Sequence, residues 1–188
     1  MNYEIRTTVA DDWARLRELR LAALRDPVAR VAFVDTYENS AVQSETFWRG
    51  RATPIAEGGA ATNVIAADDD GVWVAMLALL DETGEQSPPV GALGVIDEDG
   101  PAVRQIHVVS VYIRPEHRGT GLAGLLFRKA IDWTWANTKA ERMRLWVHGD
   151  NPRARAFYSR IGFTPTGQTM AFPPVPAETE HEMVLDRP

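Results

Sequence analysis

Hydrophobic residues near the start of the chain recur at a helical spacing. The pattern ends before Pro27, because proline interrupts a helix interior. Thr8 and Asp11 fit a capping box at the start of this helix. Residues 3–7 alternate weakly between polar and apolar side chains and predict an opening strand. The apolar face of the predicted helix consists of Trp13, Leu16, Leu19, Ala23 and Leu24.

A second helical pattern covers residues 44–51, where we expect Phe47 and Trp48 to face inward. The following segment, residues 53–61, is rich in glycine and alanine and predicts a loop. The first third of the chain is therefore expected to be a strand followed by two helices.

Two strands are predicted next, at residues 63–67 and 72–80. The residues between them, Asp68 to Gly71, are a strong hairpin signal because aspartate and glycine favour tight turns. Residues 81–103 are rich in Asp, Glu, Gly and Pro and predict a surface insertion, with one short strand at residues 90–96.

The clearest patterns lie in the second half. Residues 105–113 are rich in β-branched side chains and predict a buried strand. A helix is expected from Leu122 to about Lys139, and a further strand at residues 142–147.

The last quarter of the chain begins with a helix start. Asn151 is a preferred N-cap residue, Pro152 suits the first helical position, and Gly162 suits a left-handed C-cap. Two late strands are predicted at residues 163–170 and 180–185. Alternating strands and helices of this kind predict an α/β or α+β sheet layered with helices.

Composition is consistent with a globular protein. The chain has 188 residues, with 45% hydrophobic and 24% charged side chains, which predicts a single domain over residues 1–188. Because it has no cysteine, disulfides, thiolate nucleophiles and sulfur-based zinc sites are excluded. We find no signal-peptide pattern and no membrane-spanning run, so a soluble cytoplasmic protein is expected.

Charge is distributed unevenly. Residues 1–104 carry 9 basic and 18 acidic side chains, a net of −9, whereas residues 105–188 carry 11 and 8, a net of +3. Either this is ordinary solvated surface, or the second half meets an anion while the first half attracts a cation. Nucleic acid is a poor candidate for the anion, because there is no basic run and the sequence pI is about 5.2.

Residues 111–123 read as a strand, a tight turn and a helix. Gly119 and Gly121 allow the backbone to approach a ligand, and free N–H groups at a helix start favour an anion such as pyrophosphate. Arg118 and Thr120 could add side-chain donors. A phosphate-binding P-loop and a dinucleotide fingerprint both fit this stretch less well. The alternative is a glycine turn that binds no ligand.

Two motifs in register resemble the GNAT superfamily of acyl-coenzyme A-dependent N-acyltransferases. Arg118, Gly121 and Ala123 meet the family pattern Arg/Gln-x-x-Gly-x-Gly/Ala. Residues 151–163 are similar to its Asn-x-x-Ala-x-x-x-Tyr-x-x-x-Gly-Phe element. The resemblance is strong for residues 105–165 and looser elsewhere. It implies a mixed, mostly antiparallel sheet of six to seven strands with helices on both faces.

The resemblance also implies how acetyl-CoA, the expected co-substrate, is bound. The strand before the glycine turn splays from its neighbour, and Val111 to Ile113 pair with the pantetheine arm in the gap. A backbone N–H of Tyr112 or Ile113 polarises the thioester carbonyl. Asn151 contacts the arm, besides capping its helix. The pyrophosphate cradle consists of Arg118, Gly119, Thr120, Gly121, Leu122 and Ala123.

Tyr158 is the catalytic residue that the resemblance implies, a general acid that protonates the departing coenzyme A thiolate. The alternative is a core aromatic, because Tyr158 shares a helical face with Ala154, Phe157 and Ile161.

The general base stays open. Where several family members have a glutamate, this chain has Trp146. His148 lies two residues further on the same strand face and has a suitable imidazole, although it could equally be a surface histidine. His107 and Ser110 are other candidates, and ordered water is another route for the proton.

The expected reaction is direct transfer of an acetyl group to a primary amine, without a covalent acyl-enzyme or a metal. The acceptor is expected at residues 33–38, at Trp48 and at residues 172–180, with Asp35, Tyr37 and Glu38 either receiving a cationic amine or forming a solvated loop.

A small-molecule amine is favoured over a protein N-terminus or lysine. The rival functions are a non-catalytic acyl-CoA-binding module and a mononucleotide-binding protein. Glu178, Glu180, His181 and Glu182 lie close enough together in the sequence to be checked for metal binding. A homodimer is plausible from family habit, and neither a nucleic acid nor a membrane partner is expected.

Overall fold

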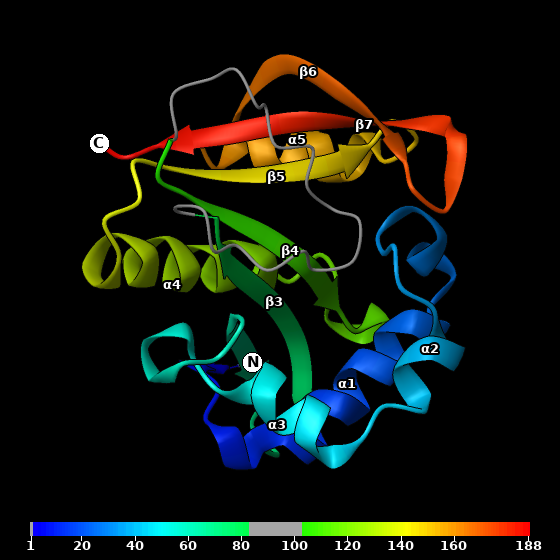
Figure 1. Cartoon of the computed structure of the whole chain (residues 1–188), viewed down its shortest axis with the longest axis vertical. Coiled ribbons are helices and arrows are strands. Elements are labelled where there is room, and N and C mark those ends of the chain that lie inside the picture. The colour runs from blue at the N-terminus through cyan, green and yellow to red at the C-terminus, as the bar shows by residue number, and fades with distance from the viewer. Residues whose placement is uncertain (1, 83–102) are drawn as a thin grey trace.

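A computed structural model describes residues 2–82 and 103–188. Its centre is a mixed sheet in the order β1-β2-β3-β4-β5-β7-β6, in which β4 and β5 pair in parallel and every other pair is antiparallel. Figure 1 shows this sheet with helices on both sides. The predicted mixed, mostly antiparallel sheet of six to seven strands is confirmed, with seven strands among the described residues. The strands are β1 (Glu4–Thr7), β2 (Thr62–Ala67), β3 (Trp73–Asp81), β4 (Gln105–Ile113), β5 (Arg142–His148), β6 (Thr164–Phe172) and β7 (Val175–Asp186).

The described residues form five α-helices that lie against the sheet. Two of them, α4 and α5, pack against one face, while α1, α2 and α3 gather at the opposite face over the β1–β4 half (Figure 1). Alternation along β2 explains this layering, because Val64 and Ala66 point to the α4 side and Ile65 and Ala67 point to the α1 side. The helices are α1 (Trp13–Arg25), α2 (Tyr37–Ala41), α3 (Glu45–Ala52), α4 (Leu122–Asn137) and α5 (Pro152–Arg160).

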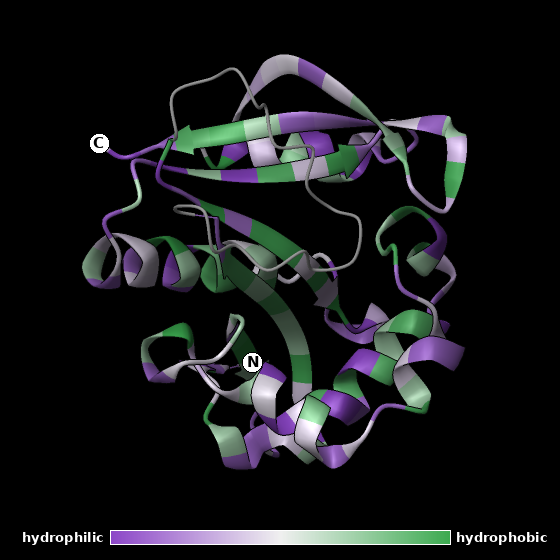
Figure 2. Ribbon diagram, in the orientation of Figure 1, coloured by the Kyte–Doolittle hydropathy of each residue, from purple (hydrophilic) through white to green (hydrophobic). Residues whose placement is uncertain are grey.

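The core is concentrated in the middle of the sheet. Strands β2 and β3 are buried along almost their whole length, whereas β6 is exposed along most of its length. Figure 2 shows the same contrast, with β3 coloured as hydrophobic and β6 as mainly hydrophilic. β6 forms one edge of the sheet, so its polar side chains face water.

Strands β4 and β5 diverge after a short parallel pairing. They pair over Gln105–His107 and Arg142–Arg144 alone, although both strands continue for several residues. β5 stays paired with β7 as far as His148, and β4 stays paired with β3 as far as Ile113. A gap therefore opens between β4 and β5 toward the ends of both strands, as Figure 1 shows.

A bulge in β4 lies beside this gap. Ser110 has a φ of 57°, a left-handed conformation that is uncommon for a residue with a side chain. The β3–β4 register shifts at the same level, because Val109 pairs with Ala78 whereas Tyr112 pairs with Met76. Side chains before and after the bulge consequently alternate in opposite phase.

The sequence predicted most elements correctly but missed some local details. Thr8 does not cap the first helix, since its buried hydroxyl donates to the carbonyl of Ala52. The carboxylate of Asp12, rather than that of Asp11, accepts from the amide of Val9, so this contact lies one residue later than expected and belongs to the 3-10 helix Ala10–Asp12. Trp48 is buried as predicted, whereas Phe47 is 40% exposed and does not face the core. The predicted strand at residues 90–96 lies outside the described residues.

Candidate active site

The glycine turn after β4 leads directly into α4. Gly119 and Gly121 have φ values of 81° and 88°, which glycine adopts without steric cost. Gly121 is the N-cap of α4 and has no side chain to satisfy the first amides of the helix. The first amides of α4 are therefore not capped by the side chain of the N-cap residue.

The amides of residues 119–123 are available for a ligand. The first amides of α4 that bond within the chain are those of Gly124 and Leu125, and both donate to the carbonyl of Gly121. Within the described part of the chain, no acceptor is found for the amides between Gly119 and Ala123. A helix start with free N–H groups carries partial positive charge and binds anions well.

The side chain of Arg118 does not join these amides. Its Nη2 donates to Oδ2 of Asp26 at 2.5 Å, and its Nε donates to the carbonyl of Ile113 at 3.0 Å. Asp26 is buried and also caps the short 3-10 helix Pro27–Val31 by accepting from the amide of Val28. Arg118 therefore fastens the glycine turn to the end of α1, a contact that the sequence did not predict.

Thr120 is also engaged within the protein. Its hydroxyl donates to the carbonyl of His117 at 2.8 Å and lies 3.3 Å from the hydroxyl of Tyr3. Tyr3 in turn contacts Nδ1 of His117 at 3.1 Å, with the two rings arranged edge to face. These contacts fix the turn from its outer side, which leaves main-chain amides as its principal ligand donors.

Main-chain groups of β4 point into the gap beside β5. The amide of Arg114 donates to the carbonyl of Val74 in β3, so the main-chain groups of Tyr112, two residues earlier, also face β3. The main-chain groups of Val111 and Ile113 face away from β3, toward the gap. Consistent with this, the carbonyl of Ile113 accepts a hydrogen bond from Arg118 and not from β3. Of the two amides considered for the thioester carbonyl, that of Ile113 faces the gap.

Tyr158 lies in the core between α4 and the sheet. Its ring packs 5.5 Å from that of Phe127 and 6.1 Å from that of Phe163, and Val111 and Ile113 belong to the same hydrophobic cluster. Burial raises the pKa of the Tyr158 phenol well above its usual range. The phenol is therefore protonated at neutral and moderately alkaline pH, and it is a weaker acid than a phenol in water.

Asn151 caps α5 as the sequence predicts. Its Oδ1 accepts from the amide of Ala154 at 3.1 Å, and Pro152 occupies the first helical position. Gly162, with a φ of 103°, follows the end of the same helix. The contact of Asn151 with a pantetheine arm stays a prediction.

His148 is buried rather than on the surface. Its Nδ1 accepts from the amide of Asp150 at 3.1 Å, so the ring proton belongs on Nε2, which lies 2.7 Å from Oε2 of Glu178. Glu178 also accepts from Arg30, which reaches across from the 3-10 helix Pro27–Val31. With both nitrogens bonded in this tautomer, His148 has no free lone pair for an incoming proton.

His107 is part of an ion network at the paired end of β4 and β5. Its Nδ1 lies 2.9 Å from Oε1 of Glu82, and the other oxygen of Glu82 lies 2.7 Å from Nε of Arg144. Arg144 also reaches Glu182 on β7 at 3.5 Å. The network joins three strands where the gap begins. Ser110, the remaining candidate base, instead accepts a bond from Arg20 of α1 at 3.3 Å.

Comparison with known proteins identifies the family. Residues 13–163 match the family described as "Acetyltransferase (GNAT) family", which is more than half of the chain. The chain belongs to this family. The resemblance seen in the two motifs is thereby confirmed, and GNAT enzymes use acetyl-CoA, the ligand for which the glycine turn was singled out.

Curated GNAT relatives match part of the chain. Mycothiol acetyltransferase from Segniliparus rotundus is 35% identical over 75 residues, which cover 37% of this chain and 26% of that protein. Spermidine N(1)-acetyltransferase from Vibrio cholerae is 33% identical over 57 residues, covering 30% of this chain and 33% of that protein. The matched region is thus about a third or less of the length of both relatives.

Solved GNAT structures resemble the whole chain. Arabidopsis thaliana NAA60 in complex with a bisubstrate analogue has a TM-score of 0.68 at 13% identity and covers both chains fully. An acetyltransferase of the GNAT family from Streptococcus pneumoniae has a TM-score of 0.67 at 18% identity, covering 99% of this chain and 100% of its own. At these identities the likeness establishes the fold.

The three residues expected to receive the acceptor amine differ in whether they already have hydrogen-bond partners. Asp35 is already bonded by the amide of Thr36 and the hydroxyl of Ser40. The hydroxyl of Tyr37 accepts from Arg25, and its ring lies against the same guanidinium. Glu38 is exposed on α2. Asp35 and Tyr37 are therefore occupied by neighbours of this chain.

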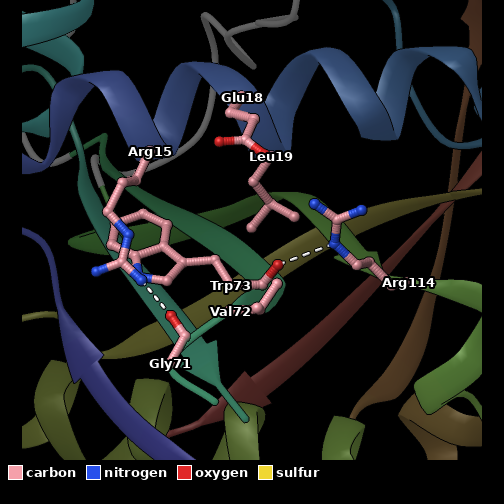
Figure 3. Close-up of a pocket in the computed structure, with 7 residues that line it drawn as sticks. All are labelled: Arg15, Glu18, Leu19, Gly71, Val72, Trp73 and Arg114. Atoms are coloured by element: carbon pink, nitrogen blue, oxygen red, sulfur yellow. Dashed lines mark hydrogen bonds between the residues drawn. The ribbon is translucent and has the colours of Figure 1, made fainter.

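A cavity of about 220 Å³ lies away from the glycine turn, between α1 and the β2–β3 hairpin (Figure 3). Arg15 lies over the ring of Trp73 and donates to the carbonyl of Gly71, while Arg114 donates to the carbonyl of Trp73. The cavity is on the β3 side of β4, whereas the gap is on the β5 side. Its lining residues are Arg15, Glu18, Leu19, Gly71, Val72, Trp73 and Arg114.

Metal and membrane sites were also sought. Across residues 2–82 and 103–188, no group of three or more His, Asp or Glu side chains is placed to hold a metal ion, including Glu178, Glu180, His181 and Glu182. None of the described helices is long and apolar enough to cross a bilayer.

Proposed function

We propose that this GNAT protein transfers an acetyl group from acetyl-CoA to a primary amine of a small molecule. The observation that supports it most is the open row of amides at residues 119–123, next to the gap between β4 and β5. One feature suits a diphosphate, and the other suits an extended arm that bonds like a strand. The gap lies beside the end of β4, and the free amides follow it in the glycine turn, so one continuous segment of chain carries both features.

The fit of acetyl-CoA to this region can be argued group by group. A Cβ added to Gly121 would meet nothing within 4 Å, so there is open space at the mouth of α4. The main-chain groups of Val111 and Ile113 face the gap, where the pantetheine arm would run beside β4. An amide aimed at the thioester carbonyl stabilises developing negative charge by about 3–4 kcal/mol.

The reaction is direct. The neutral amine attacks the thioester carbon, the carbon–sulfur bond breaks, and coenzyme A leaves as the thiol. Tyr158 supplies the proton to the departing sulfur, because its phenol is protonated and its ring packs in the same cluster as Val111 and Ile113. Because the ring nitrogens of His148 are both bonded, we assign the amine proton to ordered water rather than to His148, and a proton returned from water restores the phenol of Tyr158.

A small acceptor is favoured by two relatives whose names state small-molecule substrates, mycothiol acetyltransferase and spermidine N(1)-acetyltransferase. The alternatives are acetylation of a protein N-terminus or lysine and a non-catalytic acyl-CoA-binding module.

A screen of amines against acetyl-CoA tests the proposal, with release of free thiol as the readout. At least one small primary amine should accelerate thiol release well above the rate without amine. Peptides with free N-termini or lysines form the comparison arm, and faster reaction with them would favour the protein substrate. Binding of acetyl-CoA with no acceleration by any amine or peptide would favour the non-catalytic module.

A further inference from the structure

Glu180 of β7 is a buried carboxylate with an unsatisfied oxygen. The residue is 8% exposed, and its Oε2 has no hydrogen-bond partner among the described residues. An unpaired carboxylate is costly to bury, so such groups usually face a cation or a ligand. Burial raises the pKa of the Glu180 carboxyl, and the nearby His148 partly opposes that rise.

The register places Glu180 on the acceptor side of the gap. It pairs with His148 of β5, and their side chains lie on the sheet face that α1 covers further along, away from α4 and α5. Counting four residues along the parallel strands from the pair His107 and Arg144, His148 is level with Val111, directly after the bulge at Ser110. Glu180 thus lies level with the thioester site, one strand beyond β5.

Neighbouring cations are already bonded to other groups. Arg30 and His148 both bond to Glu178, whereas Arg144 forms ion pairs with Glu82 and Glu182, although its Nε makes no hydrogen bond of good geometry. Arg20 is directed to Ser110 and Asp35. Within the described residues, no cation is hydrogen-bonded to or ion-paired with Glu180, because His148, which is close enough to oppose the rise of its pKa, has its Nε2 bonded to Glu178.

A second unsatisfied polar atom lies on the same face. The indole Nε1 of Trp146, on β5 between Glu180 and the gap, is buried without a described partner. Trp146 pairs with Glu182 in the register, and that carboxylate is engaged by Arg144 and Thr166. Unmet polar atoms on two adjacent strands indicate a surface that is completed by a polar ligand.

We propose that Glu180 binds a second positive charge of the acceptor, one that is not acetylated. The inference rests on the proposed acetyltransferase function and narrows its substrate class to amines that carry another cationic group. The attacking nitrogen must be neutral and close to the thioester, whereas a carboxylate stabilises a charged ammonium. Glu180, one strand further away, suits the distal charge. Of the two acidic residues expected from the sequence, Asp35 is occupied by Ser40 and Thr36, and Glu38 is exposed on α2.

A binding measurement tests this without relying on turnover. Linear diamines, from diaminopropane to diaminooctane, are titrated by calorimetry into the protein saturated with coenzyme A. Each is compared with the monoamine in which a methyl group replaces one ammonium group. We expect at least one diamine to bind about tenfold or more tightly than its monoamine. Glu180→Gln should remove the preference by weakening the diamine and leaving the monoamine within about twofold.

Glu57→Gln is the matched control, because it removes one negative charge from an exposed position on the 3-10 helix Ile55–Glu57 and should leave the preference intact. Thermal melting shows that each variant is folded. A preference that persists in Glu180→Gln, equal weakening of both amines, or no preference in the wild type at any chain length would overturn the inference. Absence of heat with coenzyme A itself would count against the proposed function instead.

Discussion

Arg118 and Asp26 are 92 residues apart in the sequence, yet Nη2 of the arginine lies 2.5 Å from Oδ2 of the aspartate. The arginine belongs to the glycine motif, and the aspartate follows α1 and begins the segment that carries Arg30 and Asp35. One ion pair thus connects the glycine turn to the segment that follows α1. The hydroxyl of Tyr112 lies 3.5 Å from the same Oδ2.

Replacing Asp26 tests this connection. Asp26→Asn removes a charge-assisted bond to a partly exposed arginine, so we expect the free energy of unfolding to fall by about 1–3 kcal/mol. The affinity for coenzyme A should fall by about tenfold, because the turn loses its anchor. Urea melts and calorimetry measure the two effects.

Asp11→Asn is the control for Asp26→Asn. It removes a carboxylate that also pairs with an arginine, Arg49, but that is 91% exposed. Its stability should therefore stay within about 0.5 kcal/mol of the wild type. Equal effects of the two substitutions would show that the Asp26 pair has no special role.

Gly121→Ala tests the open mouth of α4. The left-handed φ of 88° strains an alanine by about 1–2 kcal/mol, and the new Cβ would stand where the diphosphate is expected. Gly58→Ala is a matched control, since Gly58 has a φ of 86° and equally open surroundings far from the turn. Both should lose similar stability, but Gly121→Ala alone should weaken coenzyme A binding, by at least about tenfold. Similar affinities in both variants would argue against a diphosphate at this turn.

Tyr158→Phe tests the general acid. The substitution keeps the packing against Phe127 and Phe163, so coenzyme A affinity should change little, while turnover should fall by at least about tenfold. Steady-state kinetics with an accepted amine and calorimetry with coenzyme A provide the two readouts. Unchanged turnover would leave Tyr158 as a core aromatic.

His148→Gln tests the assignment of the amine proton. Glutamine can still accept from Asp150 or donate to Glu178, and we expect turnover to fall by less than about tenfold. Loss of a general base costs about 10²–10⁴ in rate and removes the acidic limb of the pH–rate profile. A loss of that size, together with a changed profile, would restore His148 as the base.

The second half of the chain was predictable because its signals are local. Asn151 caps α5 through the amide of Ala154, three residues away, and Gly162 ends that helix by its own conformation. Likewise, the closely spaced Gly119 and Gly121 predicted a turn followed by the start of a helix, as observed. The sequence alone therefore located the glycine turn and the residues around it.

Contacts between distant segments were not predictable in the same way. The sequence pattern ends the first helix before Pro27 and assigns no role to Asp26. In the structure Asp26 starts the next turn and pairs with Arg118, a residue that spacing along the chain does not connect to it. Whether Phe47 or Trp48 faces the core depends on how α3 packs, which spacing alone does not fix. The unsatisfied oxygen of Glu180 becomes visible when β5, β6 and β7 are assembled.

The most direct test of the account is an amide NMR spectrum of the ¹⁵N-labelled protein titrated with coenzyme A. We expect the amide signals of Gly119, Gly121 and Ala123, together with those of Val111 and Ile113, to shift more than the rest of the spectrum. Signals around the cavity of Figure 3, such as Gly71 and Val72, should stay in place. If the turn and the gap-facing amides of β4 were unchanged at saturation, the claim that they bind the coenzyme would be contradicted.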